Sequence, residues 1–340
     1  MNPSAIGPIS RFQSSIPLGL MPLVIAALTV TAVQPSPAQD YPSRTITMVV
    51  PTGPGGGMET LARIFSRHLE ERLGKPLVIE NRAGAGGIIG TNSVARATPD
   101  GHTLMVANST NLAINVSLYK ELPYNPVTDL TPLLHHAFSP FVLVVNSSLP
   151  VTSVSDLVKL AKAKPGQLSY GSAGPGTAHH LFAEMLKTRT GIAVTHVPYK
   201  STMQPLTDVA AGHLNFMFAD LPPVHGLIKE GRVRALGVSS KTRLAAAPDI
   251  PPLAEVGVPG FEAMSWHMIV APGATPAPIV NKLHSELRGI AALPEIKQRI
   301  HELGLIPVDS PSVDELRNFI KVEIVRWAKI VHDAGATASQ

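Results

Sequence analysis

The chain has 340 residues, enough for two domains of ordinary size, and 44% of them are hydrophobic, so a substantial core is possible and disorder is not expected. Lys and Arg total 28 against 24 Asp and Glu, which gives a formal net charge of only +4. This balance, without a basic stripe carrying interleaved aromatics, argues against nucleic-acid binding. The absence of cysteine excludes disulfides, zinc–thiolate sites and thiol nucleophiles.

The N-terminal segment 1–38 predicts a secretory signal peptide. Arg11 precedes an apolar stretch over residues 16–33, and Ser36 and Ala38 have the small-residue spacing that signal peptidase needs. The alternative is a membrane anchor, because the stretch is just long enough to span a bilayer. Prolines within the stretch and the small-residue site favour cleavage, so we expect an exported protein.

Predicted strands and helices alternate along the first part of the chain. The order is strand 45–50, helix 59–73, strand 77–79, helix 88–97 and strand 103–107. Gly74 is expected at the C-cap of the first helix. This alternation predicts a parallel α/β sheet.

A second α/β block follows. Its predicted elements are strand 141–145, helix 153–162, strand 168–170, helix 177–188, and strands 194–197, 214–218 and 233–238. Strand 265–271 comes next, and three helical stretches end the chain, over 276–293, 294–303 and 312–334. Ser312 and Glu315 form a capping box, Ser153 with Asp156 resembles one, and Thr275–Pro276 suits a cap followed by a first helical residue.

Two similar blocks with trailing helices predict two lobes. We place the crossovers between them near Val145 and Ser265, so that one lobe is discontinuous. The expected domains are therefore 40–145 together with 266–340, and 146–265.

Two Gly-rich loops are the most informative features, because each follows a predicted strand and opens a predicted helix. A helix N-terminus carries unpaired N–H donors and about half a positive charge, which suits an anion. Glycine lets a ligand approach the main chain without meeting a Cβ atom. The glycines concerned are Gly55, Gly56, Gly57, Gly174 and Gly176. We expect the two loops to face each other and grip a carboxylate; the alternative is that both are only strand-to-helix turns.

Enzyme signatures are weaker. The segment around Ser172 looks like a nucleophile elbow, but Tyr170 stands where that motif needs glycine. The segment 84–90 is one residue too long for the dinucleotide fingerprint, and no acidic residue ends strand 103–107. No catalytic residue and no cofactor is predicted.

The histidines do not predict a metal site. The pairs 135–136 and 179–180 are adjacent in sequence and lack the i, i+4 spacing of a helical metal motif. His180 either lines the cleft as a hydrogen-bond donor or is a first-turn surface residue. Asp208 and Glu59 are expected to be structural, with Glu59 favoured by the helix dipole, and Trp327 is expected in the core.

Several motifs in order resemble the Bug family, the periplasmic solute receptors of tripartite tricarboxylate transporters. They lie at residues 41–44, 49–56, 62–63, 80–87, 99–104, 168–174, 176–177, 180–181, 196–200, 234–236, 259–260, 266, 271–272, 275–276 and 326–327. The resemblance covers nearly the whole chain after the signal segment. It implies an α/β, two-lobed Venus-flytrap fold of the periplasmic-binding-protein type, hinged by two crossover strands. It also implies a small carboxylate ligand (a di- or tricarboxylate, amino acid or aromatic acid) and membrane permease subunits as partners.

The family's two pincer loops, which hold a carboxylate mostly through main-chain amides and bridging water, match residues of this chain. By motif position the implied ligand-binding residues are Thr52, Gly53, Pro54, Gly55, Gly56, Ser172, Ala173, Gly174, Gly176, Thr177, His180 and Asp220. The sequence departs from the family at three places. Glu59 replaces a usual aspartate, Ser201 a usual glycine, and Ala219 a usual aspartate, with Asp220 one place on.

The sequence thus predicts a non-enzymatic carboxylate receptor without metal or cofactor, acting as a monomer in the periplasm. One alternative is a sensory carboxylate-binding module that signals to a membrane partner, because it would use the same clamp. The other is an exported hydrolase, which would need a nucleophile or acid–base set.

Overall fold

The structure is a computed structural model that describes residues 41–336. The predicted signal peptide lies outside the described residues. None of the helices within residues 41–336 combines the length and the apolar character needed to cross a membrane.

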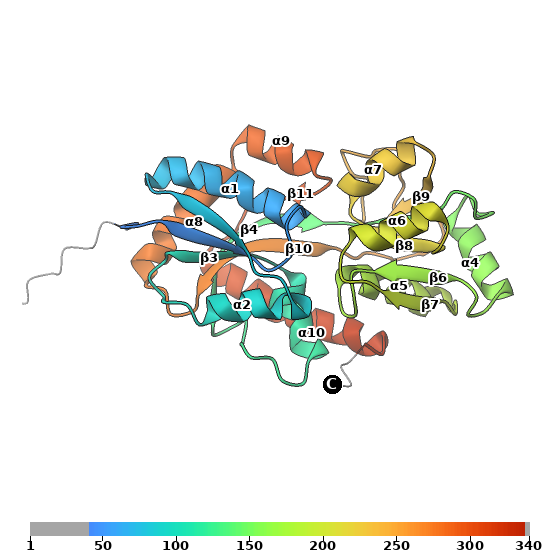
Figure 1. Cartoon of the computed structure of the whole chain (residues 1–340), viewed down its shortest axis with the longest axis horizontal. Coiled ribbons are helices and arrows are strands. Elements are labelled where there is room, and N and C mark those ends of the chain that lie inside the picture. Colours follow the sequence, from blue (N-terminus) through green and yellow to red (C-terminus); the bar gives the residue numbers. More distant parts are fainter. Residues whose placement is uncertain (1–40, 337–340) are drawn as a thin grey trace, which may run out of the picture. The chain divides into compact units, whose positions relative to one another are not determined.

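Two β-sheets organise the described chain (Figure 1). The first sheet contains, in spatial order, β11 (Ile306–Pro307), β4 (Leu130–Ser139), β10 (Ser265–Pro272), β3 (Thr103–Asn108), β1 (Ile46–Val50) and β2 (Leu77–Asn81). The second sheet contains β7 (Thr195–Pro198), β6 (Ser169–Ser172), β8 (Phe216–Ala219), β5 (Val142–Asn146) and β9 (Val233–Val238). The strands β2, β1 and β3 pair in parallel, as do β7, β6 and β8.

Helices cover both faces of each sheet. Those around the first sheet are α1 (Gly57–Leu73), η1 (Ala85–Gly87), α2 (Ile88–Ala95), the π-helical turn η2 (Thr110–Ile114), α3 (Asn115–Leu118), α8 (Ala277–Ala291), α9 (Pro294–Glu302) and α10 (Val313–Asp333). Those around the second sheet are α4 (Val154–Ala163), α5 (Ala178–Thr190), α6 (Met203–Ala211) and α7 (Leu221–Lys229). The predicted two-lobed α/β fold is therefore confirmed.

The layers follow from the apolar faces. On the first sheet, α1 and α8 bury Phe65 and Leu283 on one face, and α2 and α10 bury Val94 and Leu316 on the other. On the second sheet, α4 and α5 share one face, whereas α6 and α7 cover the opposite face. Each sheet is buried on both sides, as expected for parallel strands joined by helices.

The chain passes between the sheets twice. β4 ends in the first sheet at Ser139, and β5 begins in the second sheet at Val142. Because β5 pairs with β8 and β9, this passage comes a few residues earlier than the predicted crossover near Val145. The return passage lies between β9 and β10, whose first residue is Ser265. The exact limits of the two lobes remain a prediction.

Helix ends agree with the sequence at most positions. Ser153 accepts the N–H of Asp156, Ser312 and Glu315 form a complete capping box, and Gly74 ends α1 in the left-handed conformation. The predicted cap at Thr275 is wrong. Pro276 is the residue before α8, and the Thr275 hydroxyl donates instead to the Pro272 carbonyl at 2.7 Å.

The C-terminal helix α10 joins both lobes. It packs against β4, η2 and α3 of the first lobe and against α5 of the second. Trp327, which is 1% exposed as predicted for a core residue, stacks on Phe182 of α5 with ring centroids 6.2 Å apart. The buried Glu323 carboxylate accepts the indole N–H of Trp266 at 2.7 Å and that of Trp327 at 3.0 Å. This carboxylate ties the start of β10, next to a crossover, to the helix.

Replacing Glu323 tests this tie. In Glu323→Leu two buried indole N–H groups lose their acceptor, which should lower the free energy of unfolding by about 2–4 kcal/mol. Glu323→Gln keeps a carbonyl acceptor of the same size and should lose clearly less. Urea unfolding of both variants measures the difference. A leucine variant as stable as the glutamine variant would show that the tie contributes little.

Candidate functional site

The first predicted loop lies where two parallel strands end. β1 and β3 are neighbours, so their carboxyl ends open at the same edge of the first sheet. β1 leads into residues 51–56 and then α1, whereas β3 ends at Asn108 and Ser109 connects it to η2. The start of β10 reaches the same place, because His267 pairs with Asn108. Sequence reasoning found the loop but missed Asn108 and His267.

A side chain of α1 holds this loop. The N–H of Gly55, whose φ is +84°, donates to Glu59 Oε2 at 2.6 Å, and Arg63 Nε donates to Glu59 Oε1 at 3.0 Å. These bonds lower the pKa of Glu59, first through the Gly55 N–H and then through Arg63. Sequence reasoning gave Glu59 no role beyond the helix dipole. The structure adds that its carboxylate already occupies one amide of the loop.

The second predicted loop is held in the same way. The N–H of Gly176, with φ +73°, donates to His180 Nδ1 at 3.1 Å. Glu59 and His180 each lie four residues after the glycine that they hold, and each is the third residue of its helix. The N–H of Gly174 donates to Ser172 Oγ at 3.0 Å. Three of the glycine amides expected to face a ligand are therefore engaged by the chain itself.

Three stacked aromatic rings support the second loop. His180 and His196 lie 4.2 Å apart by ring centroids, and Tyr170 lies 4.9 Å from His196. Burial lowers the pKa of His196 to about 4 and also lowers the pKa of His180. A neutral His180 ring is what the bond from Gly176 requires, because a protonated Nδ1 could not accept it.

Ser172 and His196 resemble a nucleophile and its base. Ser172 Oγ lies 2.7 Å from His196 Nε2, the distance expected of such a pair. Ser172 is fully buried, however, and its hydroxyl is used within the loop by the Gly174 amide. No carboxylate in residues 41–336 hydrogen-bonds the His196 ring to orient it. The pair shapes the loop and does not form a triad.

The remaining predicted residue, Asp220, lies beside the second loop. β6 and β8 are parallel neighbours, so Asp220 at the end of β8 emerges next to the loop that follows β6. Its Oδ2 lies 3.3 Å from Nε2 of His179, the residue before His180. The structure thus gathers Ser172, His180 and Asp220 around one end of the second sheet.

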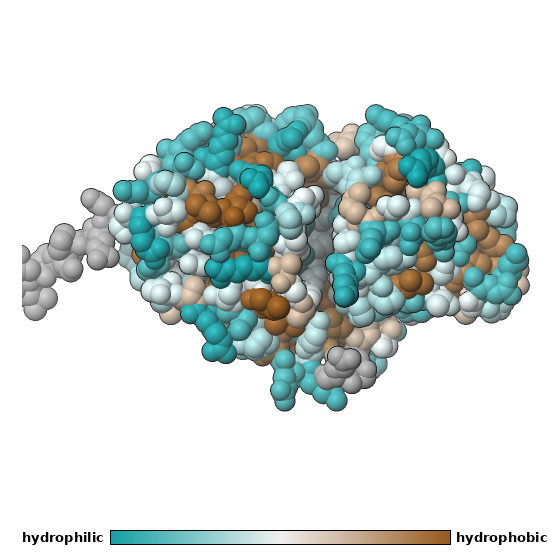
Figure 2. All heavy atoms as spheres, in the orientation of Figure 1, coloured by the Kyte–Doolittle hydropathy of each residue, from teal (hydrophilic) through white to brown (hydrophobic). Residues whose placement is uncertain are grey.

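Contacts also join the two lobes near the loops. A methyl group at Gly176 would overlap Cδ2 of Leu118 in α3, so the second loop packs directly against the first lobe. Figure 2 shows a narrow recess on this face between the atoms around the first sheet and those around the second.

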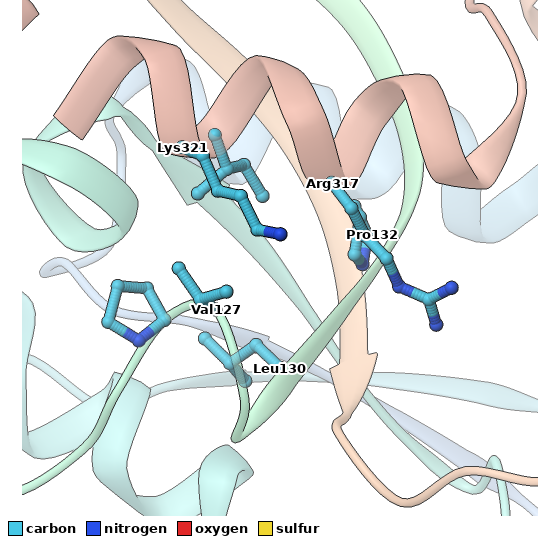
Figure 3. A pocket seen from close by; sticks show the side chains of 7 residues that line it. Val127, Leu130, Pro132, Arg317 and Lys321 are labelled. Carbon is cyan, nitrogen blue, oxygen red and sulfur yellow. The ribbon is translucent and has the colours of Figure 1, made fainter. Parts of the chain in front are cut away.

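Two small cavities lie elsewhere. One, of about 80 Å³, is lined by Pro126, Val127, Leu130, Pro132, Arg317, Ile320 and Lys321 (Figure 3). The other, of about 210 Å³, lies between residues 242–246 and residues 301–306. Neither is lined by a predicted ligand-binding residue, and Arg317 of the first is paired with Asp314 at 2.9 Å. Within residues 41–336 no three His, Asp or Glu side chains are grouped to hold a metal ion.

These features define a two-lobed α/β binding protein, with loops at the carboxyl ends of its parallel strands. The chain belongs to the family described as the tripartite tricarboxylate transporter family receptor, which it matches over residues 61–336. This confirms the resemblance to the Bug receptors.

Three solved structures are similar over most of the chain. Rpa4515 of R. palustris, solved with adipate, is 36% identical with a TM-score of 0.82, covering 87% of this chain and 98% of its own. The periplasmic binding protein BugD is 32% identical with a TM-score of 0.79, covering 87% and 99%. MatC (Rpa3494) from Rhodopseudomonas palustris, with bound malate, is 31% identical with a TM-score of 0.78, covering 86% and 100%.

Gly176→Ala tests the packing of the second loop on Leu118. The control is Gly166→Ala, because Gly166 has nearly the same φ, +72°, but open space around it. Both variants should lose about 1–2 kcal/mol from the left-handed backbone. Gly176→Ala should lose a further 1–3 kcal/mol, roughly, from the overlap. Leu118→Ala should recover part of that extra loss, as measured by urea unfolding, and equal losses in the two glycine variants would contradict the contact.

Acid should destabilise the protein through its buried rings. Burial lowers the pKa of His135, His196 and His267 to about 4, whereas a histidine of the unfolded chain titrates near 6.5. Below about pH 6.5 these histidines therefore bind protons in the unfolded chain but not in the folded chain. Their contribution to the free energy of unfolding is fully present above that pH and is lost as the pH falls toward about 4. We expect Tm to drop over this range, and a constant Tm would contradict these shifts.

Proposed function

We propose that the protein is a periplasmic receptor that captures a small organic carboxylate between its two Gly-rich loops and passes it to a tripartite-type membrane permease. The observation that carries the proposal is the matched pair of loops, each held by the third residue of the helix that it opens. The bound adipate of Rpa4515 and malate of MatC support a carboxylate as the ligand class.

The donors for the carboxylate come from the helix starts and the exposed loop backbone. First-turn N–H groups of a helix have no partner within the helix, so Met58 of α1 and Ala178 of α5 keep theirs available. Gly53 and Gly56 add main-chain N–H groups, and at both residues no atom lies within 4 Å of the position that a Cβ would take. Both helix dipoles favour an anion at these positions.

The ligand-binding set that we propose is the one predicted from the sequence, with its members divided between two tasks. Gly55, Gly174, Gly176, Ser172, Thr177 and His180 set the loop shape, since their hydrogen bonds are internal. Thr52, Gly53, Pro54, Gly56 and Ala173 line the ligand, and Asp220 borders it. A set complete within one chain is compatible with a monomer.

Closure of the lobes around the ligand would complete the site, as in other two-domain receptors. Because a transport receptor must release its cargo, we expect a dissociation constant on the order of 1 μM, about −8 kcal/mol. Export through a cleaved signal segment at residues 1–38 would deliver the receptor to the compartment from which the permease takes its substrate.

Gly56→Val tests the site without disturbing the fold. Gly56 has an extended backbone with φ −91°, and no atom lies within 4 Å of the position of a new Cβ. Because Gly56 is the N-cap of α1, where glycine is favoured over valine, the variant should lose about 1 kcal/mol of stability but stay folded, while its side chain blocks the approach of a carboxylate. We expect adipate or malate binding, measured by calorimetry, to weaken at least tenfold or so, about 1.4 kcal/mol.

The matched control is Gly226→Val, in the second turn of α7, where the space is equally open. It should bind as the unmodified protein does. If Gly56→Val binds the acid as tightly as the unmodified protein does, the first loop is not part of the ligand-binding site.

A further inference from the structure

The residue that holds the second loop is itself flanked by a buried carboxylate. His180 accepts the Gly176 N–H at Nδ1, and its other ring nitrogen, Nε2, lies 3.9 Å from Glu184 Oε1. His180 and Glu184 are one turn apart on the same face of α5, and Gly176 lies four residues before His180. Sequence reasoning assigned Glu184 no role.

The first loop has the same arrangement with the chemistry reversed. Glu59 accepts the Gly55 N–H, and Arg63, four residues further along α1, donates to Glu59 Oε1 at 3.0 Å. In each lobe the glycine is held by a side chain four residues on, and that side chain has a partner after four more. The partner is a cation where the holding group is a carboxylate, and a carboxylate where the holding group is an imidazole.

The Glu184 carboxylate is fixed in place beside His180. Glu184 is 7% exposed, its Oε1 accepts the hydroxyl of Tyr170, and both of its oxygens accept from Lys187 Nζ at 2.7 Å. The rings of Tyr170 and His180 are nearly parallel, at 14°, with centroids 6.4 Å apart, and His196 stacks on His180 at 4.2 Å. These contacts keep a carboxylate oxygen beside Nε2 while Nδ1 faces the loop.

The position of the imidazole proton decides whether the second loop is held. A neutral ring carries one proton, and Nδ1 can accept the Gly176 N–H only when that proton is on Nε2. Burial, the largest influence, lowers the pKa of His180 although Glu184 raises it, so the ring is neutral at neutral pH. A carboxylate beside Nε2 favours an N–H there, because a lone pair would face negative charge. This tautomer is the one that the bond from Gly176 requires.

We propose that Glu184 is a positioning residue for the ligand: by keeping the His180 proton on Nε2, it secures the Gly176 amide and so sets the second loop for a carboxylate. Glu184 acts through His180 and not by contact with the ligand. The inference rests on the proposed function, because the shape of the second loop affects affinity only if that loop binds the ligand.

Nitrogen NMR of the histidine rings tests the tautomer without any ligand. In the unmodified protein at neutral pH, His180 should show a protonated Nε2 and an unprotonated Nδ1. Glu184→Gln removes the charge but keeps an oxygen for the Tyr170 hydroxyl, and we expect a mixture with the Nδ1–H form. A protonated Nδ1 in the unmodified protein, or a tautomer that Glu184→Gln leaves unchanged, would overturn the proposal.

A double-mutant cycle tests whether Glu184 acts through His180. Calorimetry at neutral pH would use adipate or malate, whichever binds the unmodified protein more tightly. Glu184→Gln should weaken binding about threefold to tenfold, roughly the net worth of one hydrogen bond. Added to His180→Ala, the same change should have little further effect, because the residue that transmits it is gone. Weakening of equal size in both backgrounds would show that Glu184 only supports the fold.

Glu323→Gln is the matched control. Glu323 is also buried, also accepts from an aromatic side chain, and pairs with Arg326 three residues on, as Glu184 pairs with Lys187. Any effect of Glu323→Gln on affinity should be the same with and without His180→Ala, because Glu323 and His180 share no contact. If Glu323→Gln also loses its effect in the His180→Ala background, the coupling reports general loosening and the proposal fails.

The two proposals fail in different ways. If an acid binds but Glu184→Gln changes neither its affinity nor the His180 tautomer, the carboxylate receptor stands and Glu184 is not a positioning residue. If neither acid binds the unmodified protein, the proposed function fails, and the effect of Glu184 on ligand affinity fails with it.

Discussion

Each Gly-rich loop is held by the third residue of the helix that follows it. The side chain of that residue accepts a hydrogen bond from the N–H of the glycine four residues before it. Glu59 holds Gly55 in the first lobe, and His180 holds Gly176 in the second. Both glycines have positive φ, a conformation that costs glycine little and other residues more. The shape of each loop is thus fixed before any ligand arrives, and such preorganisation lowers the entropy lost on binding. The rest of the site depends on this constraint, because the hydrogen-bonded amides of Gly55 and Gly176 fix the backbone that orients the remaining N–H groups of each loop.

The two holding residues differ in chemistry, because one accepts as a carboxylate and the other as an imidazole ring. Glu59 accepts as a carboxylate, and the pKa of that carboxyl is lowered first by the Gly55 N–H and then by Arg63. His180 accepts only as a neutral ring, which burial favours by lowering its pKa. Behind the loops, Glu323 anchors Trp266 and Trp327 where the lobes join. The molecule therefore combines stiff loops with an anchored connection, an arrangement suited to lobes that close as bodies around a small anion.

The strand–helix alternation up to α5 was predictable because buried parallel strands read as apolar runs and their loops as glycine clusters, whereas α6 and α7 were not predicted. β4 escaped prediction, since Pro132 and the adjacent His135 and His136 interrupt its apolar run; the strand accommodates them with register shifts against β10 and burial of both rings. The two loops were found from local composition, but Asn108 and His267 were not. Asn108 reaches the site through the parallel pairing of β3 with β1, and His267 reaches it through the pairing of β3 with β10, which are more than 150 residues apart in sequence. The hydrogen bonds from the Gly55 and Gly176 N–H groups to Glu59 and His180 also have no sequence pattern that would predict them.

The central claim is that one carboxylate is shared by the two loops. A crystal structure of the protein with its tightest-binding acid tests this most directly. If the loops share the carboxylate, its oxygens will lie about 2.7–3.2 Å from at least one main-chain nitrogen of each loop, or be joined to that nitrogen by a single water. An acid that contacts one loop only, or that lies in the cavity beside Arg317 and Lys321, would contradict it.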